Sequence, residues 1–260
     1  MAIITLTTDF GTSDPFVGIM KGVIASRAPL ARVIDVTHGV PPQCILAGAL
    51  ILRAAVPYFP PGTIHVAVID PGVGSGRRPL CIEAAGSVLV GPDNGLLSLA
   101  APAATLRRIV HVTDERVFLS PRSTFDGRDV FAPVAAALAT GTVPAALGVE
   151  VDTMERLSLP PVETDAGTVR GRVLYVDHFG NLITNVPGEE LERFRGRSLS
   201  LSIRGASVPG LAPAYSSVAR GEPVALVNSW GLVEIAVRDG SAGATLGAGE
   251  GDPVVIAPGG

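Results

Sequence analysis

The sequence is poor in charge, and above all in lysine. Lys21 is the only lysine, and charged residues make up 17% of the 260 positions. Because the net charge is −4, the chain has no basic stripe that could follow a phosphate backbone. We therefore expect no nucleic acid among its partners.

Long apolar runs and paired cysteines are also missing. The apolar segment that begins at Ile45 is interrupted by Arg53 and Pro57, and the first residues lack the basic start of a secretion signal. Cys44 and Cys81 stand alone, outside any C-x-x-C pair, which favours free thiols over a disulfide. We expect no membrane among the partners and a reducing, cytoplasmic location.

Patterns that hold metals or nucleotides are absent as well. Four histidines stand singly, with no H-x-x-x-H pair: His38, His65, His111 and His178. This spacing predicts no metal site. The glycines of the G-x-G-x-G run at 72–76 are not followed by a helical pattern, so the fingerprints of dinucleotide and phosphate loops are not met.

The first part of the chain alternates between strand and helix patterns. Residues 3–8, 32–38 and 66–69 are rich in β-branched residues, and apolar residues recur at helical spacing over 16–26 and 43–55. Such alternation is typical of a mostly parallel sheet with flanking helices.

A further helix is predicted over about 130–140, where Pro133 fits only in the first turn. After residue 168 the pattern changes to short strands with glycine-rich connections, which favours a small barrel or sandwich. We predict an α/β protein with an N-terminal α/β domain, residues 1–163, and a C-terminal small β-barrel domain, residues 168–260.

The stretch Val66–Leu80 stands at the centre of this pattern. A short apolar run ends abruptly in Asp70, which is followed by Pro71, three glycines and two arginines. In open α/β sheets, ligands bind beyond the carboxyl ends of the strands, so this loop is the predicted functional site. The alternative is a structural turn, in which Pro71 fixes φ and Asp70 caps the loop.

Six motifs occur in order along nearly the whole chain: LTTDFGTSD at 6–14, DVTH at 35–38, DPGVG at 70–74, GPDNG at 91–95, TFDGRD at 124–129 and DHFGNLITN at 177–185. Together they resemble segments of the S-adenosyl-L-methionine (SAM) hydroxide adenosyltransferases. These enzymes are SAM hydrolases related to the fluorinases and chlorinases.

The resemblance implies an N-terminal α/β domain, a C-terminal β-barrel and a homotrimer. SAM is then expected at subunit interfaces, between the N-terminal domain of one subunit and the C-terminal domain of its neighbour. The implied reaction is attack of water on the ribose C5′ of SAM, which gives adenosine and methionine. Because the sulfonium is already a good leaving group, we expect neither a cofactor nor a metal.

The resemblance also implies three catalytic positions. Asp70 and Arg77 fall where the family carries an acid and an arginine that organise the water, and Arg78 is the second choice if the loop turns differently. Asp126 departs from the family, which has a histidine at this place in the motif. Two carboxylates beside one guanidinium repel each other, so the altered third member leaves the efficiency of hydrolysis open.

The substrate contacts follow from the same motifs. Asp9 matches the ligand of the ribose diol, because a carboxylate can accept from both hydroxyls, and Asp14 matches a methionine contact or caps the first helix. The positions that resemble contacts to methionine or adenine, or that serve as barrel turns, are Asp177, Asn181 and Ser229. Tyr215 or Trp230 is expected to stack on the purine, with ordinary packing as the alternative.

Two further functions remain open at this point. One is a SAM- or adenosine-binding protein with little turnover, which the missing histidine at position 126 favours. The other is a SAM-dependent halogenase, which Asp70 opposes because a carboxylate there would repel a halide.

Overall fold

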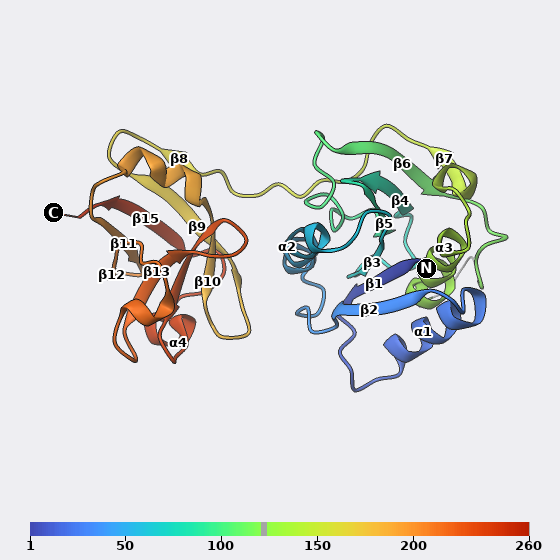
Figure 1. Cartoon of the computed structure of the whole chain (residues 1–260), viewed down its shortest axis with the longest axis horizontal. Coiled ribbons are helices and arrows are strands. Elements are labelled where there is room, and N and C mark those ends of the chain that lie inside the picture. Colours follow the sequence, from blue (N-terminus) through green and yellow to red (C-terminus); the bar gives the residue numbers. More distant parts are fainter. Residues whose placement is uncertain (121–123, 260) are drawn as a thin grey trace. The chain divides into compact units, whose positions relative to one another are not determined.

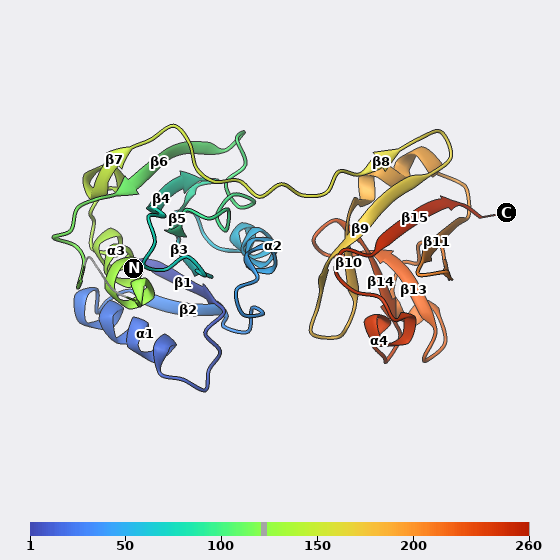
Figure 2. The same ribbon diagram turned by 180° about the vertical axis from the view of Figure 1, so that it is seen from behind.

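The computed structural model describes residues 1–120 and 124–259. They form two compact units, Met1–Leu157 and the chain from Ser158 onward. Figure 1 labels the elements of both units, and Figure 2 shows them from behind.

The first unit is built on one mixed sheet. Its strands, in spatial order, are β2 (Arg32–Thr37), β1 (Ile3–Thr8), β3 (Ile64–Val68), β5 (Ser87–Pro92), β4 (Pro79–Ala84), β6 (Leu106–Val112) and β7 (Gly148–Glu150). The pairings from β2 to β5 are parallel, and those from β5 to β7 are antiparallel. The carboxyl ends of β1, β2 and β3 therefore meet at one edge, where the polar motifs follow them.

Helices cover both faces of this sheet. In Figures 1 and 2, α1 (Phe16–Arg27) and α3 (Ala132–Ala139) lie on one side of β1 and β3, and α2 (Ile45–Ala55) lies on the other. Helix α1 buries Val17, Met20 and Ile24, whose spacing places them on one helical face. Short 3₁₀ turns at Val56–Tyr58 and Pro144–Leu147 complete the unit.

The predicted helix at 130–140 begins earlier than expected. A π-helical turn at Gly127–Phe131 precedes α3, and the N–H of Ala132 donates to the carbonyl of Gly127, five residues earlier. Pro133 lies in the first turn of α3, as predicted. The extra turn places Asp126 directly at the start of a helical segment.

The second unit is an antiparallel sheet that nearly closes on itself. Its strands, in spatial order, are β12 (Ala206–Pro209), β11 (Leu199–Ile203), β15 (Pro253–Pro258), β9 (Val169–Val176), β10 (Leu182–Pro187), β14 (Leu232–Val237) and β13 (Pro223–Val227), with β8 (Glu163–Thr164) paired to β9. Strands β12 and β13, at the two ends of this order, lie in contact. The predicted fold class, an α/β part followed by a barrel-like β part, is confirmed. The first sheet is mixed and not mostly parallel, because the hairpin of β4 and β5 and the strands beyond it add antiparallel pairings.

The core of the second unit is aliphatic. Leu182, Leu201, Val233 and Ile256 are fully buried. Leu201 and Ile256 alternate with more exposed residues along β11 and β15, whereas β14 is buried along its whole length. The remaining helical elements are the 3₁₀ turns Gly188–Phe194 and Tyr215–Ser217 and the short helix α4 (Ala242–Leu246).

Candidate active site

Asp70 lies two residues beyond β3, at the carboxyl edge of the first sheet. Its side chain is only 5% exposed, and Arg77 binds both carboxylate oxygens. Nε of Arg77 donates to Oδ1 at 2.9 Å, and Nη2 donates to Oδ2. Because this bidentate arrangement fixes the plane of the carboxylate, the loop holds a negative charge in one defined orientation.

Asp126 approaches the same guanidinium from a distant segment. Its Oδ2 accepts from Nη2 of Arg77 at 2.5 Å, and its side chain is 14% exposed. The following residue, Gly127, has no room for a side chain, because a Cβ would lie 2.8 Å from the ring of Phe125. The π-helical turn that begins there is a feature often found at functional sites.

Arg77 is thus shared by two carboxylates. Burial alone would lower its pKa, but hydrogen bonds and charge from Asp70 and then Asp126 raise the pKa of Arg77 above its ordinary value. Its guanidinium also lies 5.3 Å from the ring centroid of Phe131. The arginine therefore remains a permanent cation between two acids.

Arg78 has a different partner from its neighbour. Its Nε donates to Asp93 at 2.7 Å, and its Nη2 donates to the carbonyl of Thr153. Asp93 in turn accepts from the N–H of Glu155 at 2.7 Å. Arg78 therefore ties the 153–155 segment to the sheet edge and does not pair with Asp70.

A cavity of about 680 Å³ opens beside Arg77 and Asp126, and Asp70 is not among the residues that line it. Arg77 and Asp126 line it together with polar side chains from the loop after β3, from β6 and from the segment beyond β6, among them Ser75, Thr113 and Thr124. It offers room for solvent next to a fixed pair of charges.

The first loop carries Asp9 and Asp14. Oδ2 of Asp9 accepts the N–H of Gln43 at 2.8 Å, and the carboxylate is half-buried. Asp14 is exposed, and helix α1 begins after Pro15 without a side-chain cap. The cap that was the structural alternative for Asp14 is therefore not formed.

In the second unit, Asp177 and Asn181 form one turn. Oδ1 of Asp177 accepts the N–H groups of Phe179 and Asn181, and Oδ2 accepts Nδ2 of Asn181 at 3.0 Å. These bonds are the barrel-turn chemistry that the sequence allowed, and they also hold the carboxylate at the turn in a fixed orientation.

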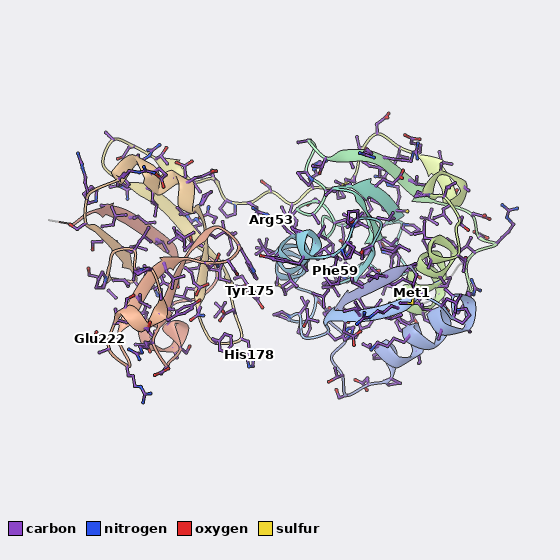
Figure 3. All side chains as sticks on the ribbon, viewed as in Figure 1. Met1, Arg53, Phe59, Tyr175, His178 and Glu222 are labelled. Carbon is purple, nitrogen blue, oxygen red and sulfur yellow. The ribbon has the colours of Figure 1, made fainter. Side chains whose placement is uncertain are left out.

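Tyr215, Ser229 and Trp230 belong to neighbouring turns of the same unit. Trp230 stacks on Tyr175, labelled in Figure 3, with ring centroids 6.3 Å apart, and Ser229 is exposed. The Tyr215 hydroxyl donates to Glu234 at 2.8 Å. Burial, and then this carboxylate, raise the pKa of Tyr215 to about 12.

Sequence reasoning missed Glu234. Its carboxylate is 3% exposed on β14, and its other oxygen accepts Nδ2 of Asn228 at 3.0 Å. Asn228 also accepts the N–H of Trp230 through Oδ1. The signal was an acid within the otherwise apolar run Leu232–Val237, since such an acid needs partners when buried.

The described residues, 1–120 and 124–259, contain no cluster of three or more His, Cys, Asp or Glu side chains placed to hold a metal ion. In that same part of the chain, every helix is too short or too polar to cross a bilayer.

Comparison with known proteins identifies relatives over nearly the whole chain. The family models described as the N-terminal and C-terminal domains of SAM hydroxide adenosyltransferase match residues 4–148 and 171–255. A curated relative from Salinispora tropica, named (R)-S-adenosyl-L-methionine hydrolase, is 43% identical over 98% of both chains. A relative named fluorinase, from an Actinoplanes species, is 27% identical over 90% of both chains.

Among solved structures, an uncharacterized conserved protein from Thermotoga maritima matches with a TM-score of 0.90 and 31% identity. The match covers 99% of this chain and 100% of that one.

Proposed function

The chain belongs to the SAM hydroxide adenosyltransferase family, and we propose that it hydrolyses SAM to adenosine and L-methionine, with Asp70, Arg77 and Asp126 as its catalytic residues. The observation that carries the proposal is the buried Asp70, whose two oxygens are fixed by Arg77, and Arg77 in turn lines an open cavity together with Asp126.

In the proposed reaction, the oxygen of a water attacks C5′ while the C5′–S bond breaks. The bonding electron pair passes to sulfur, so the sulfonium becomes the neutral thioether of methionine. The water loses one proton as the new C–O bond forms, and the carboxylates beside Arg77 are the acceptors available there. Orienting the water in line with the C–S bond can contribute up to about 7–11 kcal/mol.

The substrate-binding residues in this proposal are Asp9 for the ribose hydroxyls and Asp14 for the methionine part, with the remaining contacts from Asp177, Asn181, Tyr215, Ser229 and Trp230. The fixed orientation of Asp177 and the tie between Tyr215 and Glu234 support this assignment. We further propose a cytoplasmic homotrimer with SAM bound at subunit interfaces, which sedimentation with and without SAM would test.

The test is incubation of the purified protein with SAM, followed by quantitation of both products. Adenosine and methionine in equal amounts are expected. Asp70→Asn should lower turnover by about 10²–10⁴-fold, with a much smaller change in SAM affinity. SAM binding without either product would favour the binding-protein function, and a chloride-dependent 5′-chloro product would favour the halogenase.

A further inference from the structure

The loop that carries Asp9 is held by the loop that follows β2. The N–H of Gly11 donates to the carbonyl of His38 at 2.8 Å, and the N–H of Gln43 donates to Asp9 itself. Gln43 has a φ of 64°, a conformation that costs a residue with a side chain. Strain of this kind persists where the surrounding structure enforces it, and it often accompanies function.

Two hydrogen bonds of buried side chains connect His38 to the residues on either side of Asp9. Thr8 is fully buried and His38 is 6% exposed. Oγ1 of Thr8 is 2.8 Å from Nδ1 of His38, and it accepts the N–H of Phe10 at 3.3 Å. Thr8 thus connects the imidazole to the backbone on the far side of Asp9.

The Thr8 hydroxyl accepts from Phe10 with one lone pair, which leaves its proton and a second lone pair for His38. The bond between Thr8 and Nδ1 of His38 therefore forms with either tautomer of the imidazole. Nε2 faces Asp35 at 3.1 Å, an ion-pair distance without the straight geometry of a hydrogen bond. Lys21 donates to the other oxygen of Asp35 at 2.6 Å.

We infer that His38, acting through Thr8, is a positioning residue that orients Asp9 toward the two ribose hydroxyls of the nucleoside. This rests on the proposed function, because it needs Asp9 as the diol ligand. A carboxylate that accepts from two adjacent hydroxyls tolerates little rotation, and its orientation depends on the residues that support it. His38 itself contacts no substrate.

The same strand offers a matched control. Oγ1 of Thr5 is also 2.8 Å from Nδ1 of a buried histidine, His65, but this pair lies in the sheet interior and has no bond to the Asp9 loop among the described contacts. Thr8→Val and Thr5→Val therefore remove the same chemistry at two places on β1. Only the first removes the support of Asp9.

The experiment measures binding of adenosine and of 2′,3′-dideoxyadenosine by calorimetry, with unfolding curves for each variant. In Thr8→Val, adenosine affinity should fall about tenfold, while dideoxyadenosine affinity stays the same. Thr8→Ser should restore the preference for the diol, and Thr5→Val should keep it. His38→Asn, whose side-chain amide can donate to or accept from the Thr8 hydroxyl, should retain more of the preference than His38→Gln.

The outcomes distinguish the positioning role of His38 from the proposed function in SAM hydrolysis. If Thr8→Val keeps the wild-type preference for adenosine, or weakens both nucleosides equally, the positioning role is wrong and the proposed function stands. If the unaltered protein binds neither nucleoside and releases no methionine from SAM, both are wrong.

Discussion

The two units of this protein hold their buried carboxylates in different ways. In the first unit, Asp70 and Asp126 share a guanidinium, so each negative charge has a cation within hydrogen-bond distance. In the second unit, Glu234 is buried against the neutral donors of Tyr215 and Asn228. Among the described residues, no cation forms an ion pair with Glu234 or with Asp177.

The difference indicates two uses of a fixed acid. An acid paired with arginine is rigid and keeps its charge, which suits the orientation of a small nucleophile. An acid held by neutral donors also fixes the turns that supply those donors. Its negative charge, however, is not offset by a neighbouring cation. The acids of the first unit are therefore neutralised by arginine, whereas Glu234 and Asp177 of the second unit keep a charge that no cation offsets among the described residues.

The largest effect is expected from removing the shared cation. Arg77→Met leaves two buried carboxylates side by side, so the free energy of unfolding should fall by about 3–5 kcal/mol and SAM turnover should be lost. Arg78→Met is the control, because it removes the partner of Asp93 but leaves the pair with Asp70 intact. Equal loss of turnover in the two variants would contradict a special role for Arg77.

Next in size is a pH effect at His65, an ionisable group buried in the first unit without any charged partner among its described contacts. Burial lowers the pKa of His65 to about 4 from 6.5, and the ring of Phe59, labelled in Figure 3, packs edge-on against it at 5.4 Å. The unfolded chain takes up a proton near pH 6.5, and the folded chain takes it up only near pH 4. Stability should therefore fall as the pH drops through this window, by up to about 3 kcal/mol.

His65→Gln should flatten this dependence in urea unfolding curves recorded across the same window. The exposed His178 supplies the control, since His178→Gln should leave the dependence unchanged. An identical pH slope in His65→Gln and the unaltered protein would show that other groups cause the acid sensitivity.

A smaller effect is expected from the neutral-donor site. Glu234→Leu leaves the Tyr215 hydroxyl and the Asn228 amide without their acceptor, which should cost about 1–3 kcal/mol of stability. The pKa of Tyr215 should fall from about 12 toward its ordinary 10, because the carboxylate that helps raise it is gone. Ultraviolet titration of tyrosinate would measure this, with Tyr215→Phe to identify the signal among the three tyrosines.

The smallest effect is expected from Asp126→Asn. The amide oxygen can still accept from Arg77, and the repulsion between two like charges is relieved, so stability should change by less than about 1 kcal/mol. Comparison of denaturation midpoints with those of Arg77→Met would test this. A loss as large as that of Arg77→Met would mean that the charge of Asp126, and not the shared cation, holds the loop together.

Much of the architecture could be predicted from local patterns. The strand and helix periodicities predicted the α/β part and the β part, and the motif order predicted the family. The start of the second helix was less accurate: spacing suggested residue 43, but α2 begins at Ile45, because Gln43 adopts a positive φ to meet Asp9. A contact across the chain thus displaced a helix boundary that propensity alone had suggested.

The partners of the charged residues were harder to predict. Two adjacent arginines follow the glycine-rich loop, and only their geometry shows that Arg77 pairs with Asp70 and Asp126 while Arg78 pairs with Asp93. The acid in the apolar run of β14 indicated that Glu234 needs partners, but the sequence did not show which ones, because Tyr215 and Asn228 lie in separate turns that fold back onto β14.

The sequence by itself determined which residue types lie at the strand ends, since Asp9 and Asp70 follow the β-branched runs of β1 and β3, Asp35 lies near the end of β2, and these ends share one sheet edge. Only the tertiary structure decided that Asp35 and Asp70 each receive a cation and Asp9 a backbone N–H. The physical reason is that an ion pair or hydrogen bond needs atoms within about 3 Å, and segments such as 70–77 and 126 reach that distance only after the chain has folded.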